Sequence, residues 1–233
     1  MKAKISQAYL PNLGDVYNRR YQDVRDQSTR LTACLSAEDQ QVQSMPDTSP
    51  TKWHLGHTAW FFETFVLQPE VPDYRIFDST FNYLFNSYYE LIGPRHLRAE
   101  RGLVSRPTLE EVQAYRAHVD AAMEKFFYVA SSDKLKKLCY LLELGLHHEQ
   151  QHQELILMDI KHVLSRNPFS PCSLKKEPAT VFGTHKMQWL QVPSGVYRIG
   201  HGDEDHFAFD NEKSEHETMQ GEFALSSRCV TNG

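Results

Sequence analysis

Two histidines, His148 and His152, have the spacing in this sequence that most directly indicates chemistry. They stand four positions apart in the stretch LGLHHEQQHQELILMDI, and on an α-helix this spacing places both imidazoles on one face, one turn apart. Leucine and isoleucine residues lie on the same face on either side of the pair. An unsatisfied buried polar group costs about 1–3 kcal/mol, so two polar rings in an apolar stripe need partners. A shared metal ion would satisfy both rings.

A third imidazole is available in a second histidine-rich segment, WHLGH, which ends at His57. His57 lies at helical spacing from Trp53 and Trp60, so this ring also falls within an apolar stripe. Three neutral imidazoles from two helices can occupy three positions around one ion and leave other positions open to water, substrate or oxygen. We therefore predict a metal site formed by His57, His148 and His152.

Other interpretations of these histidines remain open. Each ring could be a core residue hydrogen-bonded to a backbone carbonyl or a carboxylate, which is the usual state of a single buried histidine. His54 and His147 are weaker ligand candidates because adjacent helical residues point about 100° apart, and His96 is weaker still. The identity of the ion does not follow from three imidazoles, since zinc, iron(II), nickel and copper all accept them.

The polar neighbours of the histidine pair could support the site. Glu149 and Glu154 are expected either behind the ligands or in solvent, with neither alternative favoured. Gln151, between the two histidines, could point into a pocket, and a solvated glutamine is an equally good interpretation.

The composition excludes several classes of function. Hydrophobic residues make up 40% of the 233 residues, charged residues 24%, and the formal net charge is −5, so we expect a soluble protein without a nucleic-acid or membrane partner. No apolar run approaches the roughly 20 residues of a membrane span. The N-terminal residues show no apolar signal core, so we expect a cytoplasmic location. The four cysteines form no C-x-x-C pair, so a thiolate zinc site is not indicated.

Helical periodicity and capping signals predict a mainly α fold with four long helices. Ser49 and Pro50 are expected to start the second helix, Thr108 and Glu111 form a capping box for the third, and Ser131 or Ser132 caps the fourth. Arginine, aspartate and glutamine side chains should cover the outer face of the first helix. The four predicted helices are residues 15–35, 50–67, 108–129 and 133–164. Such a four-helix bundle commonly holds metals between facing helices.

A long crossover, residues 69–106, joins the second and third helices. A short helix is expected within FNYLFNSYYELIG, and a connection of this length is usually functional. Its basic part contains four arginines, Arg95, Arg98, Arg101 and Arg106. These side chains could bind carboxylates in a bidentate manner, although the residues alone favour a solvated basic loop.

The composition changes after the fourth helix, which suggests three parts. Residues 1–166 should form the bundle and 167–186 a linker. Residues 188–199 read as two short strands around a Pro-Ser-Gly turn, and 222–230 as a further strand. The segment 187–233 has too few apolar residues for its own core, so we expect it to be the incomplete start of a second domain.

Three segments resemble the ergothioneine-synthesis sulfoxide synthases, the EgtB family: SPTKWHLGHTAWFFETF, FNSYYELIGPRHLRAERGLVSRP and HHEQQHQELILMDIKH. The resemblance covers nearly the whole chain. It implies a DinB-like four-helix bundle with a long crossover between its second and third helices. The tail, from WLQVPSGVYRIG onward, is similar to the start of a formylglycine-generating-enzyme-like (sulfatase-modifying) domain.

The resemblance implies a non-haem iron(II) oxidoreductase. Such an enzyme uses O₂ to join γ-glutamylcysteine, or cysteine, to hercynine in ergothioneine biosynthesis, giving a sulfoxide. Matched by position, the iron ligands would be His57, His148 and His152. Arg98 and Arg101 would bind the carboxylates of the thiol substrate.

In the same family Gln151 would lie near the imidazole of hercynine. The catalytic tyrosine of the family lies beyond Gly233, so no catalytic residue is assigned, and we expect this chain alone to have little activity. Alternatives are a DinB-type thiol transferase using zinc or nickel, a synthase of the selenium analogue, and a non-catalytic metal-binding module. The sequence leaves the oligomeric state open.

Overall fold

A computed structural model describes residues 12–87, 93–172, 186–202 and 206–230. The chain divides into two compact units, residues 1–175 and 176–233. The first unit is helical, and the described part of the second contains short antiparallel strands with one turn of 3₁₀-helix. The predicted mainly α fold is therefore confirmed. The predicted three-part division, 1–166, 167–186 and 187–233, stays a prediction.

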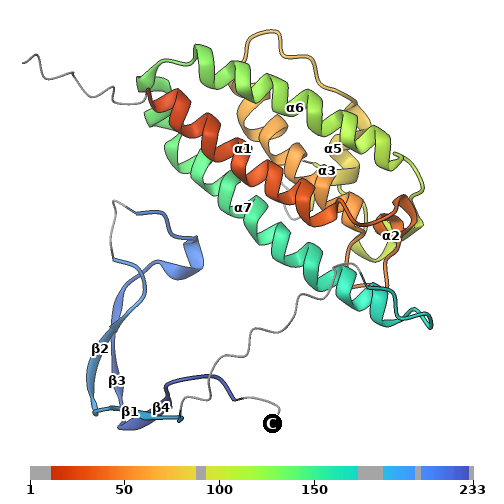
Figure 1. Ribbon diagram of the computed structural model, residues 1–233. Coiled ribbons are helices and arrows are strands. Elements are labelled where there is room, and N and C mark those ends of the chain that lie inside the picture. The colour runs from red at the N-terminus through yellow and green to blue at the C-terminus, as the bar shows by residue number, and fades with distance from the viewer. Residues whose placement is uncertain (1–11, 88–92, 173–185, 203–205, 231–233) are drawn as a thin grey trace, which may run out of the picture. The chain divides into compact units, whose positions relative to one another are not determined.

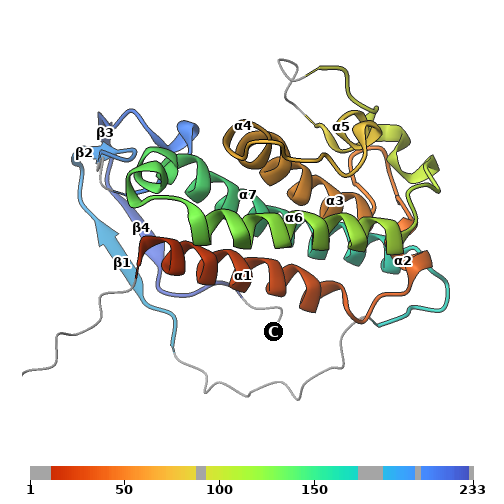
Figure 2. The ribbon, with the colours of Figure 1, turned by 90° about the horizontal axis from the view of Figure 1, so that it is seen from above.

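Four long helices of the first unit lie side by side (Figures 1 and 2). Helix α1 packs against α6 and α7, and α3 packs against the same two helices from the other side. Their bounds are Leu13–Thr32 for α1, Thr51–Phe62 for α3, Leu109–Val129 for α6 and Ser132–Ser165 for α7. The bundle thus has α3 and α7 as direct neighbours, and these are the two helices that contain the predicted metal ligands.

Shorter helices fill the connections. Part of the predicted crossover helix is present as α5, which starts two residues earlier than expected, and residues 88–92 of that stretch lie outside the described residues. The short helices are Ala37–Gln41 (α2), Gln68–Glu70 (α4), Ser79–Phe85 (α5) and a 3₁₀-helix, Arg98–Leu103 (η3). Helix η3 places the two arginines of the predicted substrate site beside the bundle.

Local capping chemistry sets the starts of α6 and α7 as predicted. The Thr108 hydroxyl accepts from the Glu111 backbone N–H, and the Glu111 carboxylate accepts from the Thr108 N–H, which starts α6. The Ser131 hydroxyl accepts from the Lys134 N–H and starts α7. Helix α1 ends at Thr32 rather than at the predicted Leu35.

The second predicted helix, residues 50–67, differs from the prediction in its N-cap and in the geometry of its last turn. Pro50 occupies the N-cap position without a side-chain hydrogen bond, and the neighbouring Ser49 instead donates its backbone N–H to the Asp159 carboxylate of α7. The regular helix ends at Phe62, and a π-helical turn, Glu63–Leu67, follows. The Glu63 carboxylate accepts hydrogen bonds from the hydroxyls of Tyr74 and Tyr115 and so attaches this turn to its neighbours.

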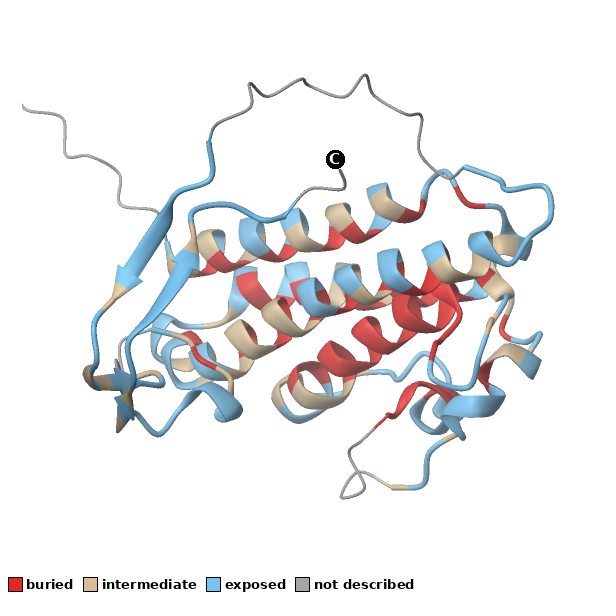
Figure 3. Cartoon of the chain, turned by 90° about the horizontal axis from the view of Figure 1, so that it is seen from below, coloured by how far each residue is buried: buried red, intermediate tan, exposed pale blue. Residues whose placement is uncertain are grey.

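The core is densest around α3, in which all 12 residues are buried. The other long helices bury one face and expose the opposite one, as Figure 3 shows. An aromatic set fills the space between α3 and its neighbours, and it contains Tyr21, Trp60, Phe61, Phe62, Phe85 and Tyr115. A helix without a solvent face has its side chains fixed from every direction. His57, the candidate ligand on this helix, is therefore held in place by its surroundings.

The second unit contains two separate two-stranded sheets. The predicted strands are present, but β1 and β2 pair with later strands rather than with each other, and β3 lies in a polar stretch where no strand was predicted. The strands are Trp189–Val192 (β1), Gly195–Ile199 (β2), His216–Gln220 (β3) and Phe223–Ser226 (β4). Most side chains in these strands are exposed.

Within the described ranges, no helix combines the length and the apolar character that crossing a bilayer requires.

Replacing Gly145 with alanine tests the close approach of α7 to α3. A Cβ atom at this position would lie 2.7 Å from Phe62 Cε1 and 2.8 Å from Phe61 Cε1, both in buried rings. We expect Gly145→Ala to lower the free energy of unfolding by about 1–3 kcal/mol through overpacking. Helix propensity alone predicts the opposite sign, a gain of about 1 kcal/mol. Chemical denaturation decides between them, and a more stable variant would contradict the close packing.

Candidate metal centre

The three predicted ligands meet at one point between α3 and α7. Each of His57, His148 and His152 offers a ring nitrogen that lies within 4.8 Å of those of the other two. Nε2 of His57 and Nε2 of His148 are 3.2 Å apart. Among the described histidine, cysteine, aspartate and glutamate side chains, these three histidines form a group that could hold a metal ion.

The ring of His57 is fixed from three sides. Trp53 and Trp60 stack on it, with centroids at 4.6 and 5.5 Å, and they lie one turn before and one turn after it on α3. Its Nδ1 lies 2.5 Å from the carbonyl oxygen of Phe85 and must donate there, because a carbonyl only accepts. Nε2 therefore keeps its lone pair, and this nitrogen faces His148.

The surroundings of all three rings favour the neutral imidazole, which is the form that binds a metal. Burial lowers the pKa of His57 and of His152 well below the usual value, and the neighbouring imidazoles lower both further. Burial also lowers the pKa of His148, to about 4. Burial therefore favours rings that each keep a nitrogen lone pair over rings that are protonated and charged.

The donor set fits a divalent metal. Two nitrogens about 2.1 Å from one ion lie about 3.2 Å apart when the bonds meet near 100°, which matches the separation of His57 Nε2 and His148 Nε2. Nδ1 of His148 is buried without a hydrogen-bond partner among the described residues. Three imidazoles suit iron(II), zinc, nickel and copper alike, so the arrangement supports a divalent metal without identifying it.

A cavity of about 490 Å³ opens onto these rings. Arg98, Arg101 and Gln151, the three predicted substrate-binding residues, all line it together with the three histidines. The structure therefore brings every predicted site residue to one cavity. The remaining lining residues are Ser49, Trp53, His54, Ser87 and Leu155.

The two arginines differ in their surroundings. Arg101 is buried, its guanidinium lies 3.4 Å from the centroid of the Trp53 ring, and it donates to the hydroxyls of Ser49 and Ser87. Arg98 is exposed at the cavity wall. A fixed and an accessible guanidinium on one wall form a cationic surface suited to carboxylates. The other two arginines of the predicted group, Arg95 and Arg106, do not line this cavity.

The weaker candidates fall outside the ligand group. His147 lies 3.9 Å from Glu143 on the partly exposed side of α7, and His96 lines a smaller hollow in the crossover. His54 does reach the site, but behind His152: its Nδ1 lies 2.8 Å from Nδ1 of His152. Glu154 is exposed, so the solvent alternative holds for this residue.

Glu149, which was expected either behind the ligands or in solvent, lies fully buried behind the candidate ligands. Its carboxylate accepts from Arg25 at 2.9 Å, from Arg116 at 3.1 Å and from the Ser28 hydroxyl at 2.7 Å. The prediction that arginines of the first helix face outward is wrong for Arg25, which is 4% exposed. Both arginines also donate to the hydroxyl of Thr58, the residue after His57. This network joins the two ligand-bearing helices from the side opposite the cavity.

Two residues of the site escaped the sequence analysis. Asp159 is buried and lies 2.9 Å from Nε2 of His54, and Ser87 lines the cavity. Asp159 had a usable signal, since a residue seven positions after His152 returns to the same helix face. Ser87 had none, because the crossover has no periodicity from which to place it.

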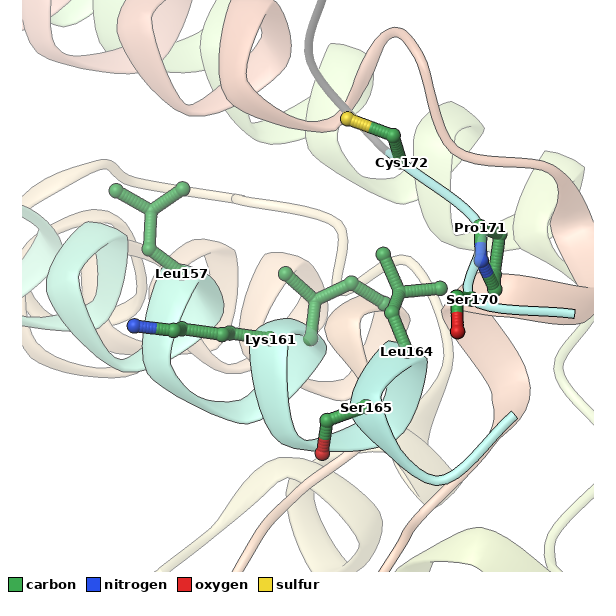
Figure 4. Close-up of a pocket in the computed structure, with 8 residues that line it drawn as sticks. Leu157, Lys161, Leu164, Ser165, Ser170, Pro171 and Cys172 are labelled. Atoms are coloured by element: carbon green, nitrogen blue, oxygen red, sulfur yellow. The ribbon is translucent and has the colours of Figure 1, made fainter. Parts of the chain in front are cut away.

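A second hollow, of about 420 Å³, lies at the C-terminal end of α7 (Figure 4). Its walls are mostly apolar, and it shares no lining residue with the histidine cavity. The residues around it are Leu157, Ile160, Lys161, Leu164, Ser165, Ser170, Pro171 and Cys172. It lacks converging polar groups that would fix a ligand, so it is a weaker candidate for binding.

A helical bundle with three imidazoles from two facing helices defines a metal-binding domain of the DinB type. The chain belongs to the DinB superfamily, whose sequence model matches residues 20–156. The matched range contains all three histidines and both cavity arginines. This superfamily includes metal-dependent enzymes of the thiol-transferase type. No curated protein sequence matches the chain.

A matched pair of histidine variants tests the metal centre. His148→Ala removes one of three candidate ligands and should lower the affinity for Co(II) or Zn(II) at least 10-fold, since both nitrogens of His54, the other histidine at the cavity, are already hydrogen-bonded. His147→Ala, one position earlier on the same helix, should bind as the unmodified protein does. Titration calorimetry measures both, and equal affinities for the two variants would contradict the assignment.

The buried ion pairs of Glu149 make a separate prediction about stability and pH. Burial alone would raise the pKa of Glu149, but Arg25 and Arg116 outweigh it and lower the pKa to about 2. The carboxylate therefore contributes stability that is complete above about pH 4.5 and is lost as the pH falls toward 2. We expect Glu149→Gln to cost about 3 kcal/mol or more at pH 7, because buried Arg116 and Arg25 lose the carboxylate that they share, and only Arg25 keeps a second partner, Asp120.

The control for this variant is Glu154→Gln, on the exposed side of the same helix. Its free energy of unfolding should stay within about 0.5 kcal/mol of the unmodified protein. Between pH 4.5 and 2, the stability of the unmodified chain should fall more steeply than that of Glu149→Gln. Parallel pH curves for the two proteins would argue against a charged Glu149 in the folded state.

Proposed function

We propose that this chain contains the metal centre of a non-haem iron(II), O₂-dependent sulfoxide synthase. The enzyme would join the sulfur of γ-glutamylcysteine, or of cysteine, to the imidazole C2 of hercynine. The observation that supports this best is the single cavity that combines three neutral imidazoles with Arg98 and Arg101. A metal site beside a cationic wall suits a small acidic thiol, and the resemblance of the motifs to the sulfoxide synthases gives the more specific substrate.

The overall reaction balances without an external reductant. A thiol R–SH and the C2–H of the imidazole react with one O₂ to give the sulfoxide and one water. The new C–S bond and the oxidation of sulfur each supply two electrons, and together these four reduce O₂. Iron held by His57, His148 and His152 would supply the sites at which thiolate and O₂ bind.

The protein's own residues would orient the substrates. Arg98 and Arg101 would hold the carboxylates of the thiol substrate through charge-assisted hydrogen bonds, with Arg101 already fixed against Trp53. Gln151, at the cavity wall, would accept or donate a hydrogen bond to the imidazole of hercynine. The stacked rings on either side of His57 and the apolar wall of Leu155 would limit water around the metal.

A second candidate function is a metal-dependent thiol transferase. Membership of the DinB superfamily favours it, and an all-imidazole ligand set accepts zinc or nickel as well as iron. In that case the metal would activate a low-molecular-weight thiol for transfer, without O₂ or hercynine. A synthase of the selenium analogue and a non-catalytic metal-binding module are further outcomes that the same experiment separates.

The test is an anaerobic titration of the Co(II)-loaded and Fe(II)-loaded protein with γ-glutamylcysteine and with cysteine. Coordination of the thiolate should produce a sulfur-to-cobalt charge-transfer band. Loss of one charge-assisted hydrogen bond costs about 1.5–3 kcal/mol, so Arg98→Met should weaken thiol binding by roughly 10-fold or more. Arg106→Met is the matched control, since Arg106 is exposed on the same crossover and does not line the cavity.

Product analysis completes the assignment. Admission of O₂ with hercynine to the iron-loaded protein should give the sulfoxide, detectable by mass spectrometry even at slow turnover. Thiol transfer by the zinc-loaded or nickel-loaded protein, with no O₂ consumption, would favour the transferase. A metal-loaded protein with no thiol-dependent spectral change would contradict both activities and leave the non-catalytic module.

A further inference from the structure

A row of three buried polar groups leads from α7, through α3 and back to a metal ligand. Asp159 Oδ2 lies 2.9 Å from Nε2 of His54, and Nδ1 of His54 lies 2.8 Å from Nδ1 of His152. All three side chains are at most 8% exposed. Such continuous pairing in a core requires that each proton have a defined position.

The hydrogen bonds assign these protons. A carboxylate only accepts, so Nε2 of His54 donates to Asp159. Nδ1 of a neutral His54 then has the lone pair and accepts from Nδ1–H of His152. His152 is left with its lone pair on Nε2. We call the hydrogen-bonded row Asp159–His54–His152 the relay. It selects the tautomer of His152 whose Nε2 is available to a metal.

His54 stands behind the ligand set rather than within it. Its donor atoms are not part of the group whose nitrogens lie within 4.8 Å of one another. Both of its nitrogens are already engaged, one by Asp159 and one by His152. Asp159 is itself held, because it also accepts the backbone N–H of Ser49, just before α3 begins. The relay therefore has a fixed far end.

Asp159 has a feature that a purely structural role does not explain. Its second oxygen, Oδ1, is buried and has no hydrogen-bond partner among the described residues. A buried, half-paired carboxylate is unfavourable by about 1–3 kcal/mol. A positive ion bound by His152 would offset this, since the negative charge would then act through two imidazoles on a cation.

The three ligands also differ in what orients them. A backbone carbonyl fixes His57, whereas His148 has no partner at Nδ1 among the described residues. We propose that His54 and Asp159 are positioning residues that hold His152 in its metal-binding tautomer and strengthen its donation to the ion. The proposal rests on the metal-binding role proposed for the three imidazoles.

Variants of His54 separate hydrogen bonding from simple packing. His54→Phe keeps an aromatic ring but removes both polar atoms, so it should weaken Co(II) affinity about 10–100-fold, the usual effect of losing a ligand's partner. His54→Gln restores an acceptor toward His152 and a donor toward Asp159, so it should recover most of the affinity. Asp159→Asn keeps the acceptor and removes the charge, so its affinity should fall between these two.

Two readouts are measured on each variant: competition with a chelator for Co(II), and the visible d–d bands of the cobalt-loaded protein. If His54 only filled space, the d–d bands of His54→Gln would be no closer to those of the unmodified protein than the bands of His54→Phe. Recovery of the bands in His54→Gln alone therefore shows that hydrogen bonding by residue 54 positions His152. His147→Gln is the control and should match the unmodified protein in both readouts. Should His54→Phe fail to fold, Asp159→Asn and His54→Gln still carry the comparison.

The outcomes separate this proposal from the function on which it rests. Unmodified protein that takes up no Co(II) would overturn both. Normal uptake by the unmodified protein, with unchanged affinity and bands in Asp159→Asn and no deficit in folded His54→Phe, would overturn the relay alone. Failure of the thiol titration, with the relay variants behaving as expected, would leave the relay standing as part of a metal site with another function.

Discussion

The closeness of α3 to α7 is the constraint on which the rest of this structure depends. Imidazoles from two helices share one point only when the backbones approach closely enough for their short side chains to meet. Gly145 permits this approach, because its missing side chain leaves space for the rings of Phe61 and Phe62. The candidate metal ligands His148 and His152 follow within the next two turns of α7. Packing of the two helices and formation of the site are therefore one event.

Charge is arranged differently on the two sides of this helix pair. Toward the cavity, the rings are neutral because burial and mutual proximity disfavour protonation. On the opposite side, Glu149 is charged and satisfied by Arg25 and Arg116. His148 and Glu149 are adjacent on α7, so neighbouring residues of one helix take part in a set of lone pairs and in an ionic network. Arg25 also pairs with Asp120, so two guanidiniums face two carboxylates in that network.

Local sequence patterns were sufficient for much of this arrangement. Helical spacing placed His57, His148 and His152 on apolar faces, and short capping motifs located the starts of α6 and α7. These features depend on residues a few positions apart. The same reasoning could anticipate that the three imidazoles would meet, because apolar faces of neighbouring helices turn toward a common core.

Features that depend on distant partners were out of reach. The polar character of Arg25 suggested solvent, whereas its burial depends on the carboxylates of Glu149 and Asp120, which are 124 and 95 positions away. The start of α3 is held by Asp159 instead of the expected Ser49 hydroxyl. Strand β3 has little apolar character, and it becomes extended through pairing with β2. In each case the deciding interaction forms only after remote segments have come together.

The completely enclosed helix α3 has a consequence for how this sequence can change over generations. A helix with a solvent face can accept substitutions at its exposed positions, but α3 offers no such freedom, since all of its residues are buried. Accepted changes there must come in compensating pairs with α5, α6 or α7. The segment from Thr51 to Phe62 should therefore change most slowly in sequence among related proteins, while the helices around it diverge.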